Sequence, residues 1–146
     1  MYQSYQSILT EIDGAIGIVT LHKEERHNAF DQLLIDELTH ALLSLDADPA
    51  VRVIVLSSAG KSFCAGADLN WMKRAITNNA QENLHDAHAF ARLMRTLNEL
   101  SKPTIARVHG PAFGGGVGLI AACDIALAQR ESIFYSPQFK HLEPIA

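Results

Sequence analysis

Two stretches near the start of the chain alternate apolar and polar residues, which is the period-two pattern of half-buried strands. They cover residues 7–12 and 15–21 and are joined by Asp13-Gly14. Because Asp-Gly between such stretches is a strong hairpin signal, we predict two antiparallel strands. Alternate residues of the second strand then share a face, which groups Ile16, Ile18 and Thr20.

Downstream, the pattern alternates between helical spacing and short apolar runs. Helices are predicted over residues 31–45, 69–75 and 81–100, and over a last segment that ends at 122. Strands are predicted over residues 51–57, 104–109, 124–128 and 132–135. The β-branched run 51–57 has the pattern of a strand covered on both faces. The expected apolar stripe of helix 81–100 is Leu84, Ala87, Ala91, Met94 and Leu97, widened by Phe90, Leu93 and Leu100. The alternation predicts an α/β fold with a single domain over 1–146.

Two glycine-rich turns each follow a predicted strand and lead into a predicted helix. The first glycine turn is residues 63–69, and the second glycine turn is residues 110–118. Such turns leave backbone N–H groups unpaired at a helix start, and these groups attract negative charge. Two turns brought together could hold the oxygen of an activated carbonyl. Gly60-Lys61-Ser62, just before the first turn, resembles the end of a P-loop but lacks the glycine five residues earlier. The cluster Gly114–Gly118 also fails the dinucleotide-binding pattern, which disfavours a nicotinamide enzyme.

Composition narrows the class of protein and its partners. The 146 residues are 48% hydrophobic and 19% charged, which favours a globular protein over a disordered one. The 12 Lys and Arg against 16 Asp and Glu give a net charge of −4 without a basic run, so we expect no nucleic acid partner. No apolar stretch reaches about 18 residues, so we expect no membrane span. The two cysteines lack a metal-binding spacing, and the first residues given lack the charged-then-apolar pattern of a signal peptide, so we expect a reduced cytoplasmic protein without a metal.

A histidine pair and two single residues are candidates for chemistry, and each has a simple structural alternative. His85 and His88 lie one helical turn apart and could bind a metal, but a solvated helix face is the favoured interpretation. Cys64 could be a nucleophile beside the first glycine turn, and it fits better as a small packed residue. His109, at a strand end, could be an acid–base group, although a packed histidine is again favoured.

Four segments in order give the chain a resemblance to a known family. They are residues 26–30, residues 53–56 with 63–69, residues 102–116, and residues 123–126. Together they resemble the enoyl-CoA hydratase/isomerase (crotonase) family, over nearly everything from residue 8 to 135. The resemblance implies a spiral of ββα turns that binds acyl-CoA thioesters. It implies no cofactor beyond the coenzyme A of the substrate, and a homo-oligomer that is a trimer or a hexamer.

The resemblance also implies roles for individual residues. The backbone N–H groups of Ala67 and Gly115 would form an oxyanion hole for the thioester oxygen, and losing one such donor typically costs about 3–4 kcal/mol in the barrier. Arg26 is a candidate contact to a CoA phosphate. The residues expected to line the CoA and acyl channel are Ala29, Ala65, Asp68 and Leu69. Residues 66–72 resemble the branch that hydrates carboxylated, branched enoyl-CoAs of the methylglutaconyl or isohexenylglutaconyl type.

The chain departs from the family where many hydratases carry two catalytic glutamates. The first slot holds Gly118 and the second holds Gln138, which cannot take a proton from water. Gln138 or the nearby carboxylate Glu143 would then position water. Family members also continue past residue 146, so the C-terminal helical part is expected to be absent. The leading hypothesis is an enoyl-CoA hydratase, with a non-catalytic acyl-CoA-binding fragment and an enoyl-CoA isomerase as alternatives.

Overall fold

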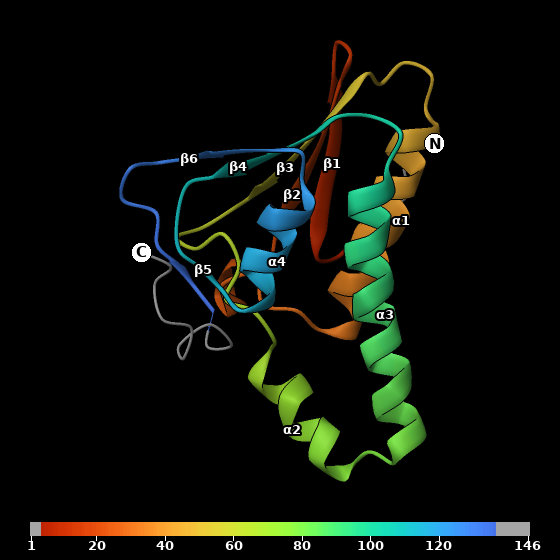
Figure 1. Cartoon of the computed structure of the whole chain (residues 1–146), viewed down its shortest axis with the longest axis vertical. Helices are drawn as coiled ribbons and strands as arrows, with labels where there is room; N and C mark the ends of the chain where they lie inside the picture. The colour runs from red at the N-terminus through yellow and green to blue at the C-terminus, as the bar shows by residue number, and fades with distance from the viewer. Residues whose placement is uncertain (1–3, 137–146) are drawn as a thin grey trace, which may run out of the picture.

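A five-stranded sheet forms the centre of the computed structural model, which describes residues 4–136 (Figure 1). The order of its strands across the sheet is β1-β2-β3-β4-β6. These strands are β1 (Ile8–Asp13), β2 (Ile16–Leu21), β3 (Val53–Ser58), β4 (Thr104–Val108) and β6 (Ile125–Ala128). The β1–β2 pair is the predicted antiparallel hairpin, and the other neighbours are parallel. Parallel pairing brings the carboxyl ends of β3 and β4, where the two glycine turns begin, to one end of the sheet.

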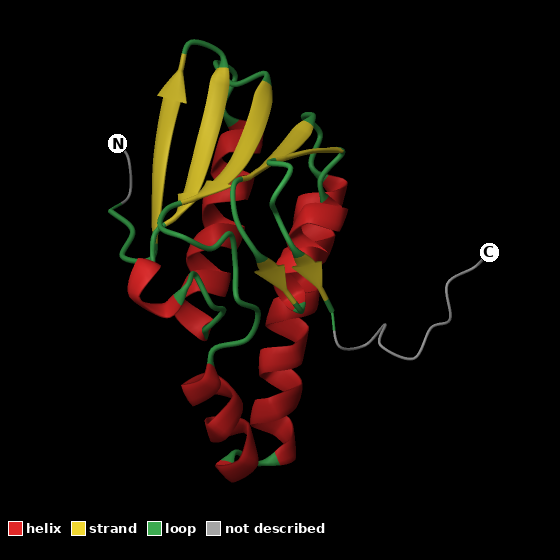
Figure 2. Cartoon of the chain, turned by 90° about the vertical axis from the view of Figure 1, so that its left-hand side faces the viewer, coloured by secondary structure: helices red, strands yellow, loops and turns green. Residues whose placement is uncertain are grey.

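Helices cover one face of this sheet, and Figure 2 shows the opposite face open toward the viewer. The helices are α1 (Gln32–Ala47), α2 (Leu69–Thr77), α3 (Ala80–Glu99) and α4 (Gly115–Ala122), preceded by a short 3-10 turn, η1 (Glu24–Arg26). The covered face of β3 presents Ile54 and Leu56, both 1% exposed. Val53 and Val55 on the other face are only half-buried, so the prediction of a strand covered on both faces was wrong. The run is rich in β-branched residues, and its composition alone does not reveal that one face is only partly covered.

Helix α3 extends beyond the sheet at its N-terminal end, next to α2 (Figure 1). Its fully buried residues are Ala89, Leu93 and Leu97. Leu84, which we placed on the buried stripe, is 57% exposed because it lies on the part that passes the edge of the core. The buried stripe of α3 is therefore rotated around the helix and shorter than we predicted. The helix begins at Ala80, one residue before the predicted range, and Asn79 and Glu82 form its N-terminal capping box.

The remaining predicted elements are confirmed to within a few residues. The predicted strand 132–135 is β7 (Phe134–Tyr135), which pairs in parallel with β5 (Ala112–Phe113) in a separate two-stranded sheet. Strand β5 was not predicted because it lies inside the second glycine turn. Among the described residues, no helix is both long and apolar enough to cross a membrane.

Candidate functional site

The first glycine turn runs beside the segment that leads into α1. Phe30 N donates to the carbonyl oxygen of Gly66 at 2.7 Å, and Asp68 N donates to the carbonyl oxygen of Phe30 at 2.8 Å. In the same way, Ala65 N donates to the carbonyl oxygen of His27 at 3.0 Å. Gly66 has φ +86°, a left-handed conformation that glycine adopts at little cost. Hydrogen bonds thus fix the backbone on both sides of Ala67.

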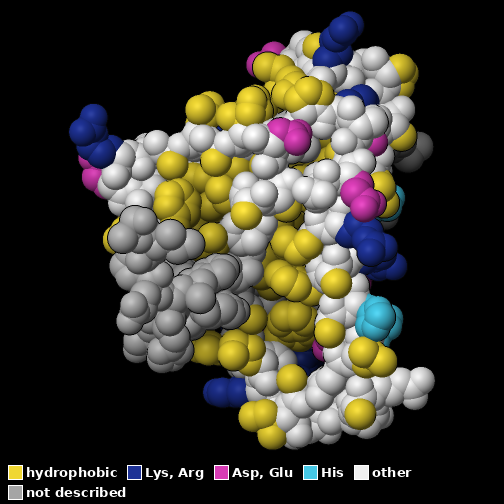
Figure 3. All heavy atoms as spheres, in the orientation of Figure 1, with side chains coloured by type: hydrophobic (Ala, Val, Ile, Leu, Met, Phe, Trp, Pro, Cys, Tyr) yellow, Lys and Arg dark blue, Asp and Glu magenta, His cyan; other side chains and the backbone are white. Residues whose placement is uncertain are grey.

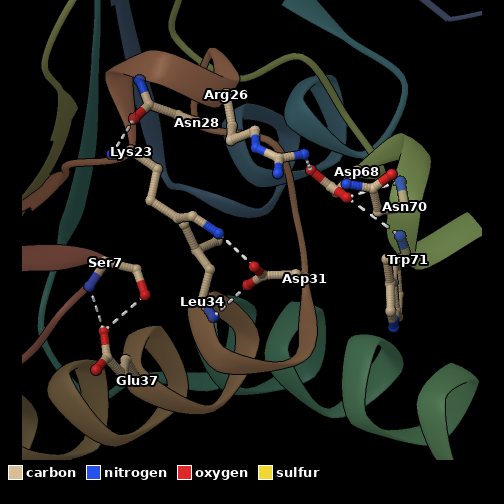
Figure 4. Close-up of polar contacts among 10 residues, drawn as sticks. All are labelled: Ser7, Lys23, Arg26, Asn28, Asp31, Leu34, Glu37, Asp68, Asn70 and Trp71. Carbon is tan, nitrogen blue, oxygen red and sulfur yellow. Dashed lines mark hydrogen bonds and ion pairs between the residues drawn. The ribbon is translucent and has the colours of Figure 1, made fainter.

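Asp68 ends this turn and starts α2 (Figure 4). Its Oδ1 accepts from the backbone N–H groups of Asn70 at 2.8 Å and Trp71 at 3.1 Å, which makes Asp68 the N-cap of the helix. Its Oδ2 accepts from Arg26 Nη1 at 3.2 Å. Both carboxylate oxygens are therefore used to hold the turn and the helix start.

The second glycine turn leads from β4 into α4 without any side-chain cap. Gly114 has φ +53°, which turns the chain sharply before the helix begins. Phe113 N donates to Cys64 O, and Gly114 N donates to Tyr135 O, each at 2.9 Å. The N–H of Gly115 is at the first position of α4, so it has no acceptor within the helix.

The two turns are in direct backbone contact. A Cβ on Gly66 would lie 2.8 Å from the carbonyl oxygen of Phe113. A Cβ on Gly116 would lie 2.6 Å from the carbonyl oxygen of Cys64. Both distances are shorter than real Cβ atoms allow, so only glycine permits this approach. The glycines are thus required by the contact between the turns as well as by turn geometry.

A cavity of about 500 Å³ opens where the two turns meet, and both Ala67 and Gly115 line it. Figure 3, in the orientation of Figure 1, shows apolar side chains gathered near the centre of the face toward the viewer. The other described lining residues are Phe30, Trp71, Ala87, Phe90, Gly114, Val117, Gly118, Ala121 and Ser136. None of the lining residues within 4–136 carries a charge. Over the same range, the N–H of Ala67 donates to no protein acceptor. Two backbone donors from different turns therefore border one apolar cavity.

The described part of the cavity lining includes none of the other predicted binding residues. Ala29 is buried, Leu69 is 71% exposed, and Asp68 is occupied as the helix cap. The Arg26 side chain is 47% exposed beside Asp68. Ala65 lies in the first glycine turn with its N–H bonded to His27. Their roles stay predictions.

Gly118 lines the cavity at the slot of the first family glutamate. A Cβ built there would meet only Met94 Sδ, at the ordinary contact distance of 3.5 Å. The site therefore has room for the start of a side chain. Gln138 and Glu143 lie outside the described residues, so their roles also stay predictions.

The cysteine and histidine candidates occupy structural or surface positions. Burial raises the pKa of Cys64 to about 12, so its thiol is protonated at neutral pH, as expected of a packed residue. His109 Nε2 lies 2.6 Å from Gly60 O and donates to it, which holds the loop before the first glycine turn. His85 and His88 line a surface groove of α3 together with Arg92. No group of three or more metal-ligating side chains occurs within residues 4–136.

Sequence reasoning missed the aromatic residues that shape the cavity. The rings of Phe30 and Phe90 meet edge to face, with centroids 5.2 Å apart and planes at 75°. Phe90 was placed on the apolar stripe of α3, and Phe30 was noted only as the end of the segment 26–30. A signal existed for that segment, because Asn28 is a residue type that tolerates φ > 0 and has φ +55°. Its buried side chain bonds Lys23 N, Ala59 O and Ser62 O, and so positions Phe30.

Comparison with known proteins gives consistent matches. The family model for enoyl-CoA hydratase/isomerase matches residues 11–141. A Thermus thermophilus protein assigned as an enoyl-CoA hydratase is 40% identical over 119 residues, which are 82% of this chain and 47% of that protein. A peroxisomal Delta(3,5)-Delta(2,4)-dienoyl-CoA isomerase of Arabidopsis thaliana is 32% identical over 142 residues, 91% of this chain and 51% of its own length.

Solved structures agree with the sequence matches. The crystal structure of a Legionella pneumophila protein assigned as an enoyl-CoA hydratase/isomerase (crotonase) superposes with a TM-score of 0.86 at 46% identity. The match covers 90% of this chain and 51% of the Legionella chain. The chain therefore spans about half the length of the relatives it matches, and it has the fold of their N-terminal part.

Proposed function

The chain belongs to the enoyl-CoA hydratase/isomerase family, and from that premise we propose that it binds an acyl-CoA thioester and hydrates a 2-enoyl-CoA. The observation that carries this proposal is the convergence of two glycine turns on one apolar cavity, with Ala67 and Gly115 in its lining. Their N–H groups would donate to the thioester oxygen from two sides. The apolar lining suits an acyl chain and lowers the local polarity, which strengthens such hydrogen bonds.

Hydration places the hydroxyl group of water on C3 of the enoyl chain and its proton on C2. Electron density moves toward the thioester oxygen when water attacks C3, so an enolate-like oxygen develops beside the two amides. Each prealigned donor of this kind lowers the barrier by about 3–4 kcal/mol. For water itself we propose Gln138 or Glu143, of which only the carboxylate can act as a base.

A spectrophotometric assay tests the proposal directly. Hydration removes the conjugated double bond, so absorbance of crotonyl-CoA or 3-methylglutaconyl-CoA should fall in the presence of the protein. Calorimetric titration with acetyl-CoA is run in parallel on the same sample. If a folded sample neither binds nor turns over any CoA thioester, the proposal is wrong.

A substitution pair at Gly118 sharpens this test. Gly118→Glu adds a carboxylate where the cavity has space for a Cβ, and Gly118→Gln adds the same bulk without a base. Because general acid–base groups contribute about 10²–10⁴-fold, we expect the Glu variant to hydrate at least about 100-fold faster than the Gln variant. Equal rates in the two variants would mean that this position does not face the reacting atoms.

The lining offers a specific reason to retain a second candidate function. No carboxylate borders the cavity among residues 4–136, so a non-catalytic acyl-CoA-binding protein is the alternative. Binding of acetyl-CoA without turnover of any enoyl-CoA would favour it. An isomerase is the other enzymatic alternative, supported by the likeness to the Arabidopsis dienoyl-CoA isomerase. Conversion of 3-enoyl-CoA to 2-enoyl-CoA would identify that activity.

We also propose self-association in the cytoplasm. The edge strand β6 exposes Ile125 by 51% and Leu127 by 58%, which is unusual for large apolar side chains in one strand. In a trimer or hexamer, a neighbouring copy of the chain would cover these apolar side chains. Native mass spectrometry of the isolated chain would return the mass of a monomer if this proposal is wrong.

A further inference from the structure

One residue connects both glycine turns, and it does so through two different parts of its structure. The backbone of Phe30 pairs with the first turn, through Gly66 O and Asp68 N, and forms a parallel bridge with Ala67. These two hydrogen bonds flank Ala67 on both sides, at 2.7 and 2.8 Å. The position of Ala67 is therefore tied to the main chain of Phe30.

The side chain of Phe30 contacts the second turn. A Cβ built on Gly115 would lie 2.9 Å from Phe30 Cε2 and 2.8 Å from Phe90 Cζ. The rings thus press against the bare Cα of Gly115, at the residue whose N–H begins α4. Phe30 is only 1% exposed, so its ring is packed among other protein atoms on all sides but the cavity that it lines.

Phe90 supports this arrangement from α3. Its ring meets Phe30 edge to face at 5.2 Å between centroids, a geometry that stabilises aromatic pairs beyond simple burial. Helix α3 packs against α1 and α4 at this level of the molecule. The Phe30 ring is thus held between the first residue of α4 and a helix of the core.

We propose that Phe30 is the positioning residue that fixes the separation of the Ala67 and Gly115 amides. The inference rests on the proposed acyl-CoA function and deepens it. With the main chain of Phe30 bonded around Ala67 and its ring against Gly115, the distance between the two donors depends on the size and rigidity of one side chain. Displacements of about 1 Å at a reacting centre can reduce rates by 10²-fold, so this spacing matters for carbonyl polarisation.

A chromophoric thioester measures that polarisation independently of turnover. Cinnamoyl-CoA absorbs at longer wavelength when its carbonyl is polarised by hydrogen-bond donors. We expect the wild-type chain to shift this absorbance to the red at saturation. Phe30→Leu keeps the backbone bonds but removes the rigid ring, and it should reduce the shift to less than half. Phe30→Met, which replaces most of the volume with a flexible chain, should give an intermediate shift.

Leu38→Ala is the matched control for general loss of stability. Leu38 is fully buried in α1 and does not line the cavity. It should lower the melting temperature at least as much as Phe30→Leu and leave the spectral shift unchanged. For hydration, Phe30→Leu should lower kcat at least tenfold while KM changes less than threefold, since binding of the CoA portion does not depend on the amide spacing.

The outcomes separate the two proposals. A full wild-type shift in Phe30→Leu overturns the role of Phe30 and leaves the acyl-CoA function standing. An equal reduction in Leu38→Ala also overturns it, because the effect would then follow stability alone. If wild-type protein neither binds cinnamoyl-CoA nor shifts its spectrum, the proposed function fails, and the positioning role fails with it.

Discussion

Ala67 of the first glycine turn and Gly115 of the second line the same cavity, but different interactions hold each turn in place. Hydrogen bonds and charges hold the first turn: Phe30 pairs with its backbone, and Asp68 caps α2 while it bonds Arg26. The second turn has no side-chain cap at α4. Backbone hydrogen bonds from Phe113 and Gly114 hold it together with close contact, because Gly116 lies against Cys64 and Gly115 against two aromatic rings. The first turn should therefore be sensitive to loss of polar side chains, and the second to atoms added at Gly115 or Gly116.

The largest effect is expected from Gly116→Ala. Its Cβ would come within 2.6 Å of a backbone oxygen that cannot move away, so overpacking should lower the free energy of unfolding by about 3 kcal/mol. Gly118→Ala, two residues along the same helix, has space and gains helix propensity, so it should be neutral or stabilise by up to about 1 kcal/mol. Urea denaturation of both variants measures this difference. Equal stabilities would contradict the close-contact account of the second turn.

The next largest effect is expected in the first turn. Asp68→Ala removes the cap of α2 and the partner of Arg26, and should cost about 1–2 kcal/mol of unfolding free energy. Asp68→Asn keeps a capping oxygen and loses only the ion pair with a half-exposed arginine, so its cost should stay below about 1 kcal/mol. Hydrogen exchange of the Asn70 and Trp71 amides, which Asp68 accepts from, reports the local change. Similar exchange in both variants would mean that the charge, rather than the cap, holds the helix start.

A smaller effect should follow from acid. Asp31 caps α1 next to Phe30 and pairs with Lys23 (Figure 4). Burial by itself would raise the pKa of Asp31, but bonds from Lys23 and Leu34 N and the Lys23 charge outweigh it and lower this pKa. A lowered folded-state pKa gives stability that is complete above the unfolded pKa of about 4 and lost as pH falls through the folded value.

Asp31→Asn tests this pH dependence, since asparagine also caps helices well but does not titrate in this range. The wild type should lose more unfolding free energy than the variant between pH 5 and about pH 3. Thermal melting across that range provides the measurement. Parallel pH profiles would indicate that Asp31 contributes only its hydrogen bonds.

The smallest effect is expected for the reactivity of the Cys64 thiol, which lies at the contact between the turns and should not react in the native protein. Burial raises the pKa of its thiol to about 12 and that of Cys123 to about 11, so both are protonated at pH 8. Neither cysteine should react with a disulfide reagent in the native protein, and both should react in urea. Rapid native modification of Cys64, located by peptide mass spectrometry, would mean that the two turns separate readily.

Much of this fold could be predicted because local sequence patterns are enough to place most of its strands, helices and turns. The Asp13-Gly14 hairpin, the α1 stripe and the two glycine turns follow from period, turn chemistry and the conformations that glycine permits. The exposure of Leu84 and the half-burial of Val53 could not be predicted in the same way. Both depend on where a partner layer ends, and spacing along the chain does not encode the extent of a neighbouring element.

For the candidate site, the sequence indicated which two turns matter but not what holds them together. The roles of Ala67 and Gly115 came from resemblance, and their shared cavity is a property of the folded chain. The connecting role of Phe30 was not visible, because residues 30, 67 and 115 are far apart in sequence. Hydrogen bonds and ring contacts among them exist only after the strands have paired.

The amino-acid sequence by itself determined most of the strands and helices, and the two glycine-rich turns that lead into helices. Those features depend on side-chain period and on the φ values that each residue allows, which are local properties. The tertiary structure decided that Ala67 and Gly115 line one apolar cavity and that the ring of Phe30 lies against Gly115. Distances between remote segments follow from how the whole sheet and its helices pack, because close packing leaves each buried side chain a single place.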